Sequence, residues 1–286
     1  RCDFLPVSAE EMHERGWWWY DALVVGGDAY VDHPSFGTAV ISRVLEAEGL
    51  RVAVLAQPDW HDAEAFRAMG RPRLGVFIGA GNLDSMVAHY TAAKRRRSED
   101  FYSPGKRTGC RPDRAAIVYC NRAREAFGPD VPIILGSLEA SLRRFAHYDY
   151  WDDSVRRAIL FDAPADLLVY GMGEAATIEI AHRLKKKQSV RTMTDIPGTG
   201  YITREPETCA FDHITLPSFE GVRDDKRLYA EATRTEYAEH DPVRGRAMIQ
   251  PCEGRYLVIN PPAMPLDTRE LDRVADLPYT REWHPM

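Results

Sequence analysis

Polar side chains that could contact a ligand gather at three glycine-containing turns of the sequence. The first turn, residues 27–37, reads GDAYVDHPSFG and combines small residues with an Asp, a Tyr, a His and a Ser. It leads into an expected helix, whose unpaired N–H groups would favour an anion. The other two turns are residues 79–84 and 136–150. The candidates for ligand contacts in the three turns are Asp28, Tyr30, His33, Ser35, Asn82, Glu139 and Arg143.

Two of these turns also have a purely structural interpretation. Glu139, Arg143 and His147 could form a general acid–base group or a clamp for an oxyanion. The alternative is a buried corner of ion pairs and aromatic rings that orients an expected helix at 152–161. Asn82 could contact a ligand or cap the helix that follows it. Because no spacing in this region defines a triad, we assign no catalytic residue.

The elements that must position these turns alternate between strand and helix. Five short apolar runs are each followed by a turn and a segment with helical spacing, and such units favour parallel strands with right-handed crossovers. The expected strands are residues 22–25, 52–55, 73–78, 132–135 and 166–170. This pattern predicts a doubly wound, mainly parallel, five-stranded flavodoxin-like α/β domain over residues 1–188. Ligands of such folds bind beyond the carboxyl ends of the strands, where the three turns lie.

The pattern changes after residue 188. A charged helical stretch at 224–239 precedes two apolar runs that flank Glu253-Gly254, which predicts a two-stranded hairpin. A proline-rich linker and a short helix at 267–275 follow. Residues 189–286 are therefore expected to form a second, smaller α+β segment.

Composition excludes several classes of protein. The formal net charge of −6 gives no overall attraction to nucleic acid or to an anionic membrane, and no apolar run approaches the ~20 residues of a membrane span. The five cysteines are odd in number and widely separated, which favours a reducing, cytoplasmic compartment. Their spacing matches neither a zinc site nor an iron–sulfur site, so we assign no metal ligand.

A basic segment at 94–114 carries eight Lys and Arg residues against three acidic ones, with Pro and Gly between them. It is expected to be a long exposed loop. An RNA-binding patch is the alternative, which predicts a salt-dependent interaction. Because only Phe101 and Tyr102 could stack on bases, we favour a solvated or docking loop.

Several stretches resemble the amino-terminal part of the YgiQ-type radical SAM proteins, also called the UPF0313 family. The long match GSLEASLRRFAHYDYWDDSVRRAILFDAPADLLVYGMGE at 136–174 is the most specific of them. The other matching stretches are GDAYVDHPSFG at 27–37, QPDW at 57–60, HYTAAKRRRSEDFYSPG at 89–105, GRYLVINPPAMPL at 254–266 and ELDRVADLPYTREWHP at 270–285. Together they cover nearly the whole chain.

This resemblance implies a radical enzyme whose Cys-x3-Cys-x2-Cys motif binds a [4Fe-4S] cluster that cleaves S-adenosylmethionine. That motif is absent here and is expected beyond Met286. The chain is then a fragment that binds neither group and has its own carboxyl-terminal radical SAM barrel as partner. The resemblance also implies a cobalamin-binding-like fold, although the Asp-x-His-x-x-Gly signature is missing around His33. Some corrinoid domains lack that His, so cobalamin binding stays open.

Three functional hypotheses follow. In the first, the chain is the accessory domain of a radical SAM enzyme of unknown substrate, and its three turns cover the barrel and help to form the substrate pocket. In the second, it is a stand-alone module that binds a corrinoid or a phosphorylated ligand. In the third and weaker one, it binds RNA through residues 94–114.

Overall fold

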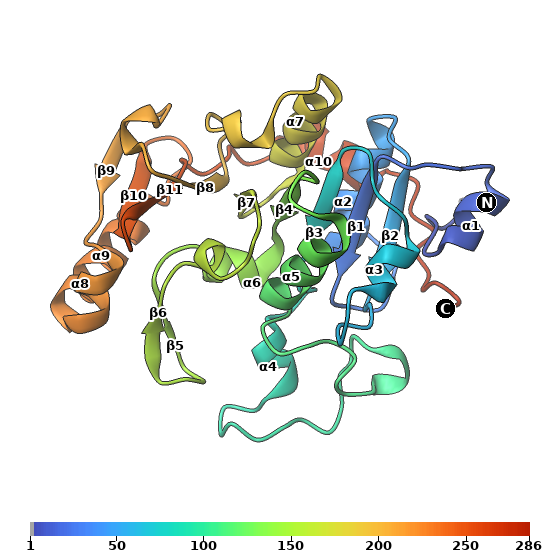
Figure 1. Cartoon of the computed structure of the whole chain (residues 1–286), viewed down its shortest axis with the longest axis horizontal. Helices are drawn as coiled ribbons and strands as arrows, with labels where there is room; N and C mark the ends of the chain where they lie inside the picture. The colour runs from blue at the N-terminus through green and yellow to red at the C-terminus, as the bar shows by residue number, and fades with distance from the viewer. Residues whose placement is uncertain (1–2) are drawn as a thin grey trace.

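The computed structural model describes residues 3–286 and shows a long twisted sheet with helices on both faces (Figure 1). Within these residues the main sheet has nine strands in the order β2-β1-β3-β4-β7-β8-β11-β10-β9. The strands are β1 (Ala22–Gly26), β2 (Val52–Ala56), β3 (Gly75–Ile78), β4 (Ile133–Leu135), β7 (Leu167–Val169), β8 (Thr199–Thr203), β9 (His213–Thr215), β10 (Ala247–Cys252) and β11 (Arg255–Ile259). A separate hairpin pairs β5 (His147–Asp149) with β6 (Ser154–Arg156).

Strands β2, β1, β3, β4 and β7 pair in parallel, so that their carboxyl ends lie at one edge of the sheet. All five strands are buried throughout because helices cover both faces. β2, which follows β1 in the chain, pairs with one side of β1, and β3 pairs with its other side. The point where the strand order reverses therefore lies between β1 and β3.

The sheet does not end at these strands, so the predicted five-stranded flavodoxin-like fold is wrong. β8 pairs antiparallel with β7 through Val169↔Thr199 and Leu168↔Gly200, and β11 and β10 continue the antiparallel part. β9 pairs in parallel with β10 at the far edge. The pairing of β7 with β8 could not be predicted, because the apolar pattern locates each strand only from its own residues. The partner of β7 lies some 30 residues further along the chain. The expected hairpin is present as β10 and β11.

The helices divide between the two faces of the sheet. α2 and α7 pack on one face against Val24, Val54 and Phe77, and α3 and α5 pack on the other against Leu23, Leu55 and Ile78. Neighbouring strand residues therefore face opposite cores, as a pleated strand requires. The α-helices are α1 (Ala9–Glu14), α2 (Gly37–Ala47), α3 (Glu64–Ala68), α4 (Ser85–His89), α5 (Ala115–Phe127), α6 (Ser137–Leu142), α7 (Glu174–Lys185), α8 (Phe219–Asp224), α9 (Lys226–Ala238) and α10 (Thr268–Ala275). Short 3₁₀ turns lie at Pro104–Lys106, Ile159–Phe161, Val190–Thr192 and Pro206–Thr208.

Two local predictions are wrong. Residues 152–161, expected to be a helix, form the second strand of the β5–β6 hairpin and a 3₁₀ turn, because Asp149 accepts hydrogen bonds from Trp151 N and Asp152 N and turns the chain back. The basic segment 94–114 is not a wholly exposed loop. Its Asp100 and Arg111 are buried and form an ion pair.

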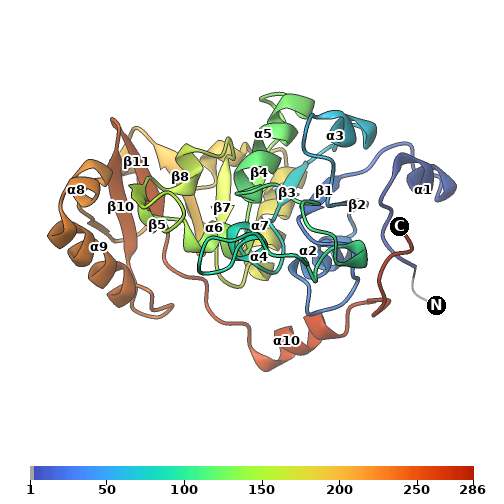
Figure 2. The same cartoon turned by 90° about the horizontal axis from the view of Figure 1, so that it is seen from below.

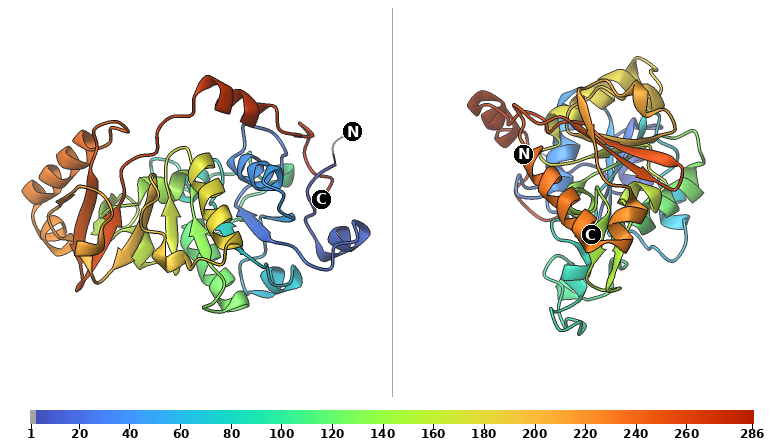
Figure 3. Two further views of the ribbon diagram at one scale, coloured as in Figure 1. Left: turned by 90° about the horizontal axis from the view of Figure 1, so that it is seen from above. Right: turned by 90° about the vertical axis from the view of Figure 1, so that its left-hand side faces the viewer.

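After β11 the chain crosses the molecule and returns to its beginning. α10 packs over α2 through Val274, and the segment after it runs along the outside of α2 to end beside the amino-terminal residues (Figures 2 and 3). There Val31 forms an antiparallel bridge with Trp283. We call residues 277–286 the C-terminal strap. No helix within residues 3–286 combines the length and the apolar character needed to cross a bilayer.

Candidate functional site

The turns after β1, β3 and β4 meet at the carboxyl edge of the sheet, and we call residues 27–37, 79–84 and 136–150 together the rim. Two glycines permit the approach of the first two turns. A Cβ at Gly27 would lie 2.0 Å from the Ala80 carbonyl oxygen, and one at Gly81 would lie 2.3 Å from Asp28 Oδ1. Gly81 also has a φ of +110°, which side-chain-bearing residues rarely adopt.

Asn82 connects the first two turns of the rim through three hydrogen bonds. Its backbone N–H donates to Asp28 Oδ2 at 2.7 Å, and its Nδ2 donates to the Ser35 carbonyl oxygen at 3.1 Å. Its Oδ1 accepts a hydrogen bond from Gly37 N at 3.3 Å, at the first residue of α2. Asn82 therefore caps α2, whereas Asp84 caps α4, the helix that follows Asn82. The expectation that Asn82 caps its own helix is wrong.

An ion-pair chain that the sequence analysis missed lies beneath these turns. Arg111 is buried, and its Nη1 lies 2.8 Å from Asp28 Oδ1 while its Nη2 lies 3.0 Å from Asp100 Oδ2. Because both carboxylates and the guanidinium are buried, each charge has lost its hydration and is stabilised by the opposite charge beside it. Arg111 gave no local signal of this role, since it stands in a basic, glycine-rich stretch that is typical of an exposed loop.

The third turn joins the rim through Ser137 and Glu139. Ser137 has a φ of 75°, a strained value for a residue with a side chain, and its Oγ accepts a hydrogen bond from Ala80 N at 3.1 Å. Glu139 is fully buried and accepts from Ser85 N at 2.8 Å and from Ala116 N at 3.1 Å. Burial raises the pKa of Glu139, the Asp84 carboxylate raises it further, and Arg143 opposes both effects.

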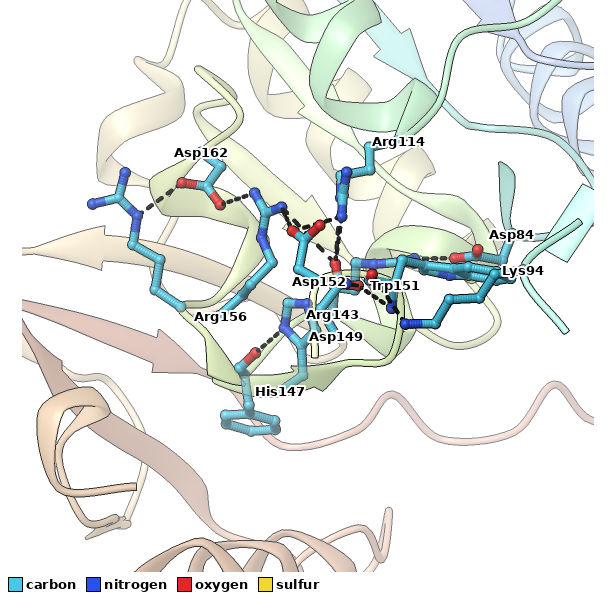
Figure 4. Close-up of polar contacts among 12 residues, drawn as sticks. Asp84, Lys94, Arg114, Arg143, His147, Asp149, Trp151, Asp152, Arg156 and Asp162 are labelled. Atoms are coloured by element: carbon cyan, nitrogen blue, oxygen red, sulfur yellow. Dashed lines mark hydrogen bonds and ion pairs between the residues drawn. The ribbon is translucent and has the colours of Figure 1, made fainter. Parts of the chain in front are cut away.

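The group proposed for acid–base chemistry is not assembled. Arg143 forms an ion pair with Asp84 (Figure 4). Glu139 accepts hydrogen bonds from backbone N–H groups. His147 lies in the β5–β6 hairpin, where its Nδ1 is 3.0 Å from the Phe145 carbonyl oxygen and burial lowers its pKa. Around it, Arg114 and Arg156 form ion pairs with carboxylates of the same region. The geometry is that of a corner of ion pairs.

The remaining candidates divide between the rim and the molecular edge. His33 Nδ1 accepts a hydrogen bond from Ser35 N at 3.1 Å, so both residues stay at the rim. Tyr30 is buried on the other side of its turn, where its ring stacks on His284 of the C-terminal strap with centroids 5.8 Å apart. Tyr30 therefore lies away from the other candidates. A ligand-binding role for any of these residues stays a prediction.

A cavity of about 300 Å³ lies beside the rim, between the sheet and helices α2 and α7. Its walls come from the carboxyl ends of β1, β3, β4 and β7, at the point where the strand order reverses. Six glycines line it: Gly37, Gly79, Gly81, Gly136, Gly171 and Gly173. Glu174, the first residue of α7, also lines the cavity, although it is not among the candidates selected from the sequence.

The C-terminal strap is fastened to the first turn of the rim. Buried Asp32 forms an ion pair with Arg43 of α2, and it accepts a hydrogen bond from Thr280 N at 2.9 Å. The backbone carbonyl of Asp32 accepts from Arg281 N, also at 2.9 Å. The position of the strap is therefore coupled to the position of residues 27–37.

Comparison with known proteins identifies the family of this chain. A model of the radical SAM N-terminal family matches residues 4–286. The chain belongs to that family. UPF0313 proteins of Clostridium botulinum and Clostridium perfringens are 52% and 53% identical to it, and each alignment covers 99% of this chain. The chain spans 44% and 43% of the length of these relatives, so it corresponds to their amino-terminal portion.

Two solved structures are similar to part of this chain. Both are of TsrM, a radical S-adenosylmethionine methyltransferase from Kitasatospora setae, one with tryptophan and a SAM analogue bound and one with cobalamin and a [4Fe-4S] cluster bound. They are 20% and 19% identical, with TM-scores of 0.39 and 0.38, over 63% of this chain and 28% and 26% of theirs. Similarity at this level does not show which ligands this chain binds.

Proposed function

We propose that this chain is the accessory amino-terminal domain of a cytoplasmic radical SAM enzyme, and that its rim faces the catalytic part that follows in the longer protein. The observation that carries the proposal is the convergence of three turns, with the cavity beside them, at the carboxyl edge of the sheet. Open α/β sheets bind their ligands at this edge. Family membership and the length of the relatives support a catalytic part beyond residue 286.

The iron–sulfur cluster of such an enzyme does not fit the residues that the structure describes. Within residues 3–286 no three His, Cys, Asp or Glu side chains are grouped so that they could hold a metal ion. Cys120 and Cys252 are buried, and burial raises the pKa of both thiols, which disfavours the thiolate that binds iron. We therefore assign no cluster ligand here and no step of the reaction to the cysteines of this chain.

Anaerobic reconstitution tests the proposal. The longer protein, loaded with iron and sulfide, is expected to release 5′-deoxyadenosine from S-adenosylmethionine, whereas residues 1–286 alone are expected to release none. Release can be measured by liquid chromatography with mass detection. A longer protein that holds a spectroscopically intact cluster but produces no 5′-deoxyadenosine would contradict the assignment.

A second candidate function is binding of a cofactor by the domain itself, with a corrinoid as the first ligand to test. The cavity of about 300 Å³ at the strand-order reversal supports binding of a small ligand or of one part of a larger cofactor, because it lies at the lower end of the range used by small ligands. Titration with hydroxocobalamin or with a flavin is expected to change the absorbance of the ligand and to raise the melting temperature. If neither signal changes with either ligand, binding of a corrinoid or a flavin by this domain is excluded.

A further inference from the structure

The cavity beside the rim is lined mainly by apolar side chains and bare backbone. Phe77, Ile134 and Val169 line it from the sheet, and Val40 and Ile41 line it from α2. The glycines contribute peptide groups without side chains. Such surfaces form flat walls, on which an aromatic ring can place more of its area than a branched alkyl group can.

The charges around the cavity do not suit an anion. Among the described residues that line it there is no Lys, Arg or His, and Glu174 is the only ionisable one. The helix ends compensate only in part. At the start of α2, Gly37 N already donates to Asn82 Oδ1, and at the start of α7 the Glu174 carboxylate itself faces the positive end of the helix dipole. A phosphate would therefore meet a carboxylate and no opposite charge.

Glu174 offers the cavity a hydrogen-bond acceptor. Glu174 lines the cavity, while one of its carboxylate oxygens, Oε2, has almost no accessible surface and no hydrogen-bond partner among residues 3–286. The nearby Tyr279 hydroxyl, whose pKa is raised to about 12 mainly by burial and also by the Asp32 and Glu174 carboxylates, is likewise without a partner there. A ligand N–H in the cavity would find the Glu174 carboxylate as the only ionisable acceptor among the described lining residues.

We propose that the cavity binds an uncharged, flat aromatic heterocycle whose N–H group donates to the Glu174 carboxylate. The proposal narrows the cofactor-binding function proposed above to a ligand, or a part of a ligand, with this chemistry. It rests on the cavity and not on the catalytic part, so failure to observe S-adenosylmethionine cleavage leaves it standing.

Titration of the full 286-residue chain by ligand-observed NMR tests it with two probes. Indole is flat and neutral and carries one N–H donor, whereas 1-methylindole has nearly the same shape but lacks the donor. Indole is expected to bind at least about ten-fold more tightly, because a hydrogen bond to a charged acceptor is lost with the methyl group. Inorganic pyrophosphate is expected to show no binding at this site.

Three variants connect the result to the cavity. Glu174→Gln is expected to reduce the preference for indole to less than about three-fold, since a neutral amide is the weaker acceptor. Glu179→Gln on the same helix is the matched control, because Glu179 does not line the cavity and pairs with Arg183 instead. Ile41→Trp would fill the cavity and abolish indole binding.

Comparing the affinities of indole and 1-methylindole for the unchanged chain tests the proposal even if Ile41→Trp does not fold. Equal affinities for indole and 1-methylindole would overturn the role of Glu174. Absence of indole binding, or displacement of indole by pyrophosphate, would overturn the proposed ligand class. If the longer protein releases 5′-deoxyadenosine in any of these cases, only the ligand proposal has failed.

Discussion

Glu139 illustrates how a residue suited to acid–base chemistry can serve the fold. It stands in the densest polar cluster of the sequence, yet both carboxylate oxygens accept hydrogen bonds from backbone N–H groups of other segments. Ser85 N belongs to α4 and Ala116 N to α5. One side chain therefore joins three helices below the rim. The residue type could be read from the sequence, but its partners could not, because they lie 54 and 23 residues away.

Replacing Glu139 tests this structural role. Glu139→Ala is expected to lower the free energy of unfolding by about 2–4 kcal/mol, since it leaves two buried N–H groups without acceptors. Glu139→Gln, which keeps one acceptor, should cost about half as much. The exposed Glu125→Ala is the control and should change stability by less than about 1 kcal/mol. Urea unfolding measures all three. Equal stabilities of Glu139→Ala and the control would contradict the role.

Glu236 on α9 should make stability depend on pH. Burial raises its pKa from 4.5 to about 7, and the attraction of Arg144 only partly opposes this. The folded state then binds the proton more tightly than the unfolded state. The contribution of Glu236 to stability is therefore full below about pH 4.5 and is lost as the pH rises to about 7. Glu236→Gln should match the unchanged chain at pH 4.5 and exceed it by about 2–3 kcal/mol above pH 7. Urea unfolding measures the free energies of both chains. If the difference between Glu236→Gln and the unchanged chain is the same at every pH in this range, the effect is excluded.

At the scale of elements, the rim depends on contacts between turns that follow different strands. Asn82 is the clearest case, because its side chain bridges the turn after β1 and the start of α2. The glycines at 27 and 81 allow this approach, and Ser137 closes it from the third turn. These contacts also account for the strained φ of Ser137, which the hydrogen bond from Ala80 N helps to hold.

Loss of the Asn82 side chain should loosen the rim without unfolding the domain. Asn82→Ala is expected to lower the free energy of unfolding by about 1–2 kcal/mol, the range of a lost helix cap, and to speed amide exchange in residues 27–37. Asn121→Ala on α5 is the matched control, since within residues 3–286 its side chain donates only to the Ile117 carbonyl oxygen of its own helix. Hydrogen–deuterium exchange followed by mass spectrometry compares the two. The assignment fails if both variants exchange at the same rate in 27–37.

The sequence predicted local elements well and distant pairing poorly. The apolar runs located β1, β2, β3, β4 and β7, and the helix expected at 267–275 forms as Thr268–Ala275, because each signal lies within a few residues. The antiparallel extension from β7 to β8 was missed, since strand pairing leaves no mark in either strand alone. The three turns were correctly expected to meet, because parallel strands place the turns that follow them at one edge of the sheet. The buried Asp28–Arg111–Asp100 chain beneath them was not predicted, because its members lie far apart in the sequence.

At the scale of the whole molecule, the C-terminal strap connects the rim to whatever follows residue 286. It lies on the outside of α2 and is held by Asp32, which itself belongs to the first turn of the rim (Figure 2). A catalytic part that continues from the strap would therefore start at a fixed place relative to the rim. The proposed boundary at residue 188 stays a prediction, although strands on both sides of it share one sheet.

Asp32→Ala should release the strap. The change leaves the buried Arg43 guanidinium without its main partner and removes the acceptor for Thr280 N, so a loss of about 3–5 kcal/mol is expected. Limited proteolysis should then cut within residues 277–286 at lower protease concentration. Glu46→Ala removes the other, more exposed partner of Arg43 and serves as the control. A strap that stays equally resistant in both variants would show that Asp32 does not hold it.

Amide exchange of residues 1–286, alone and within the longer protein, tests the central claim most directly. If the rim faces the catalytic part, exchange in residues 27–37, 79–84 and 136–150 should slow in the longer protein, while the turns at 70–73 and 128–131 on the opposite edge of the sheet should not change. Slowing at that opposite edge, with the rim unaffected, would contradict the account.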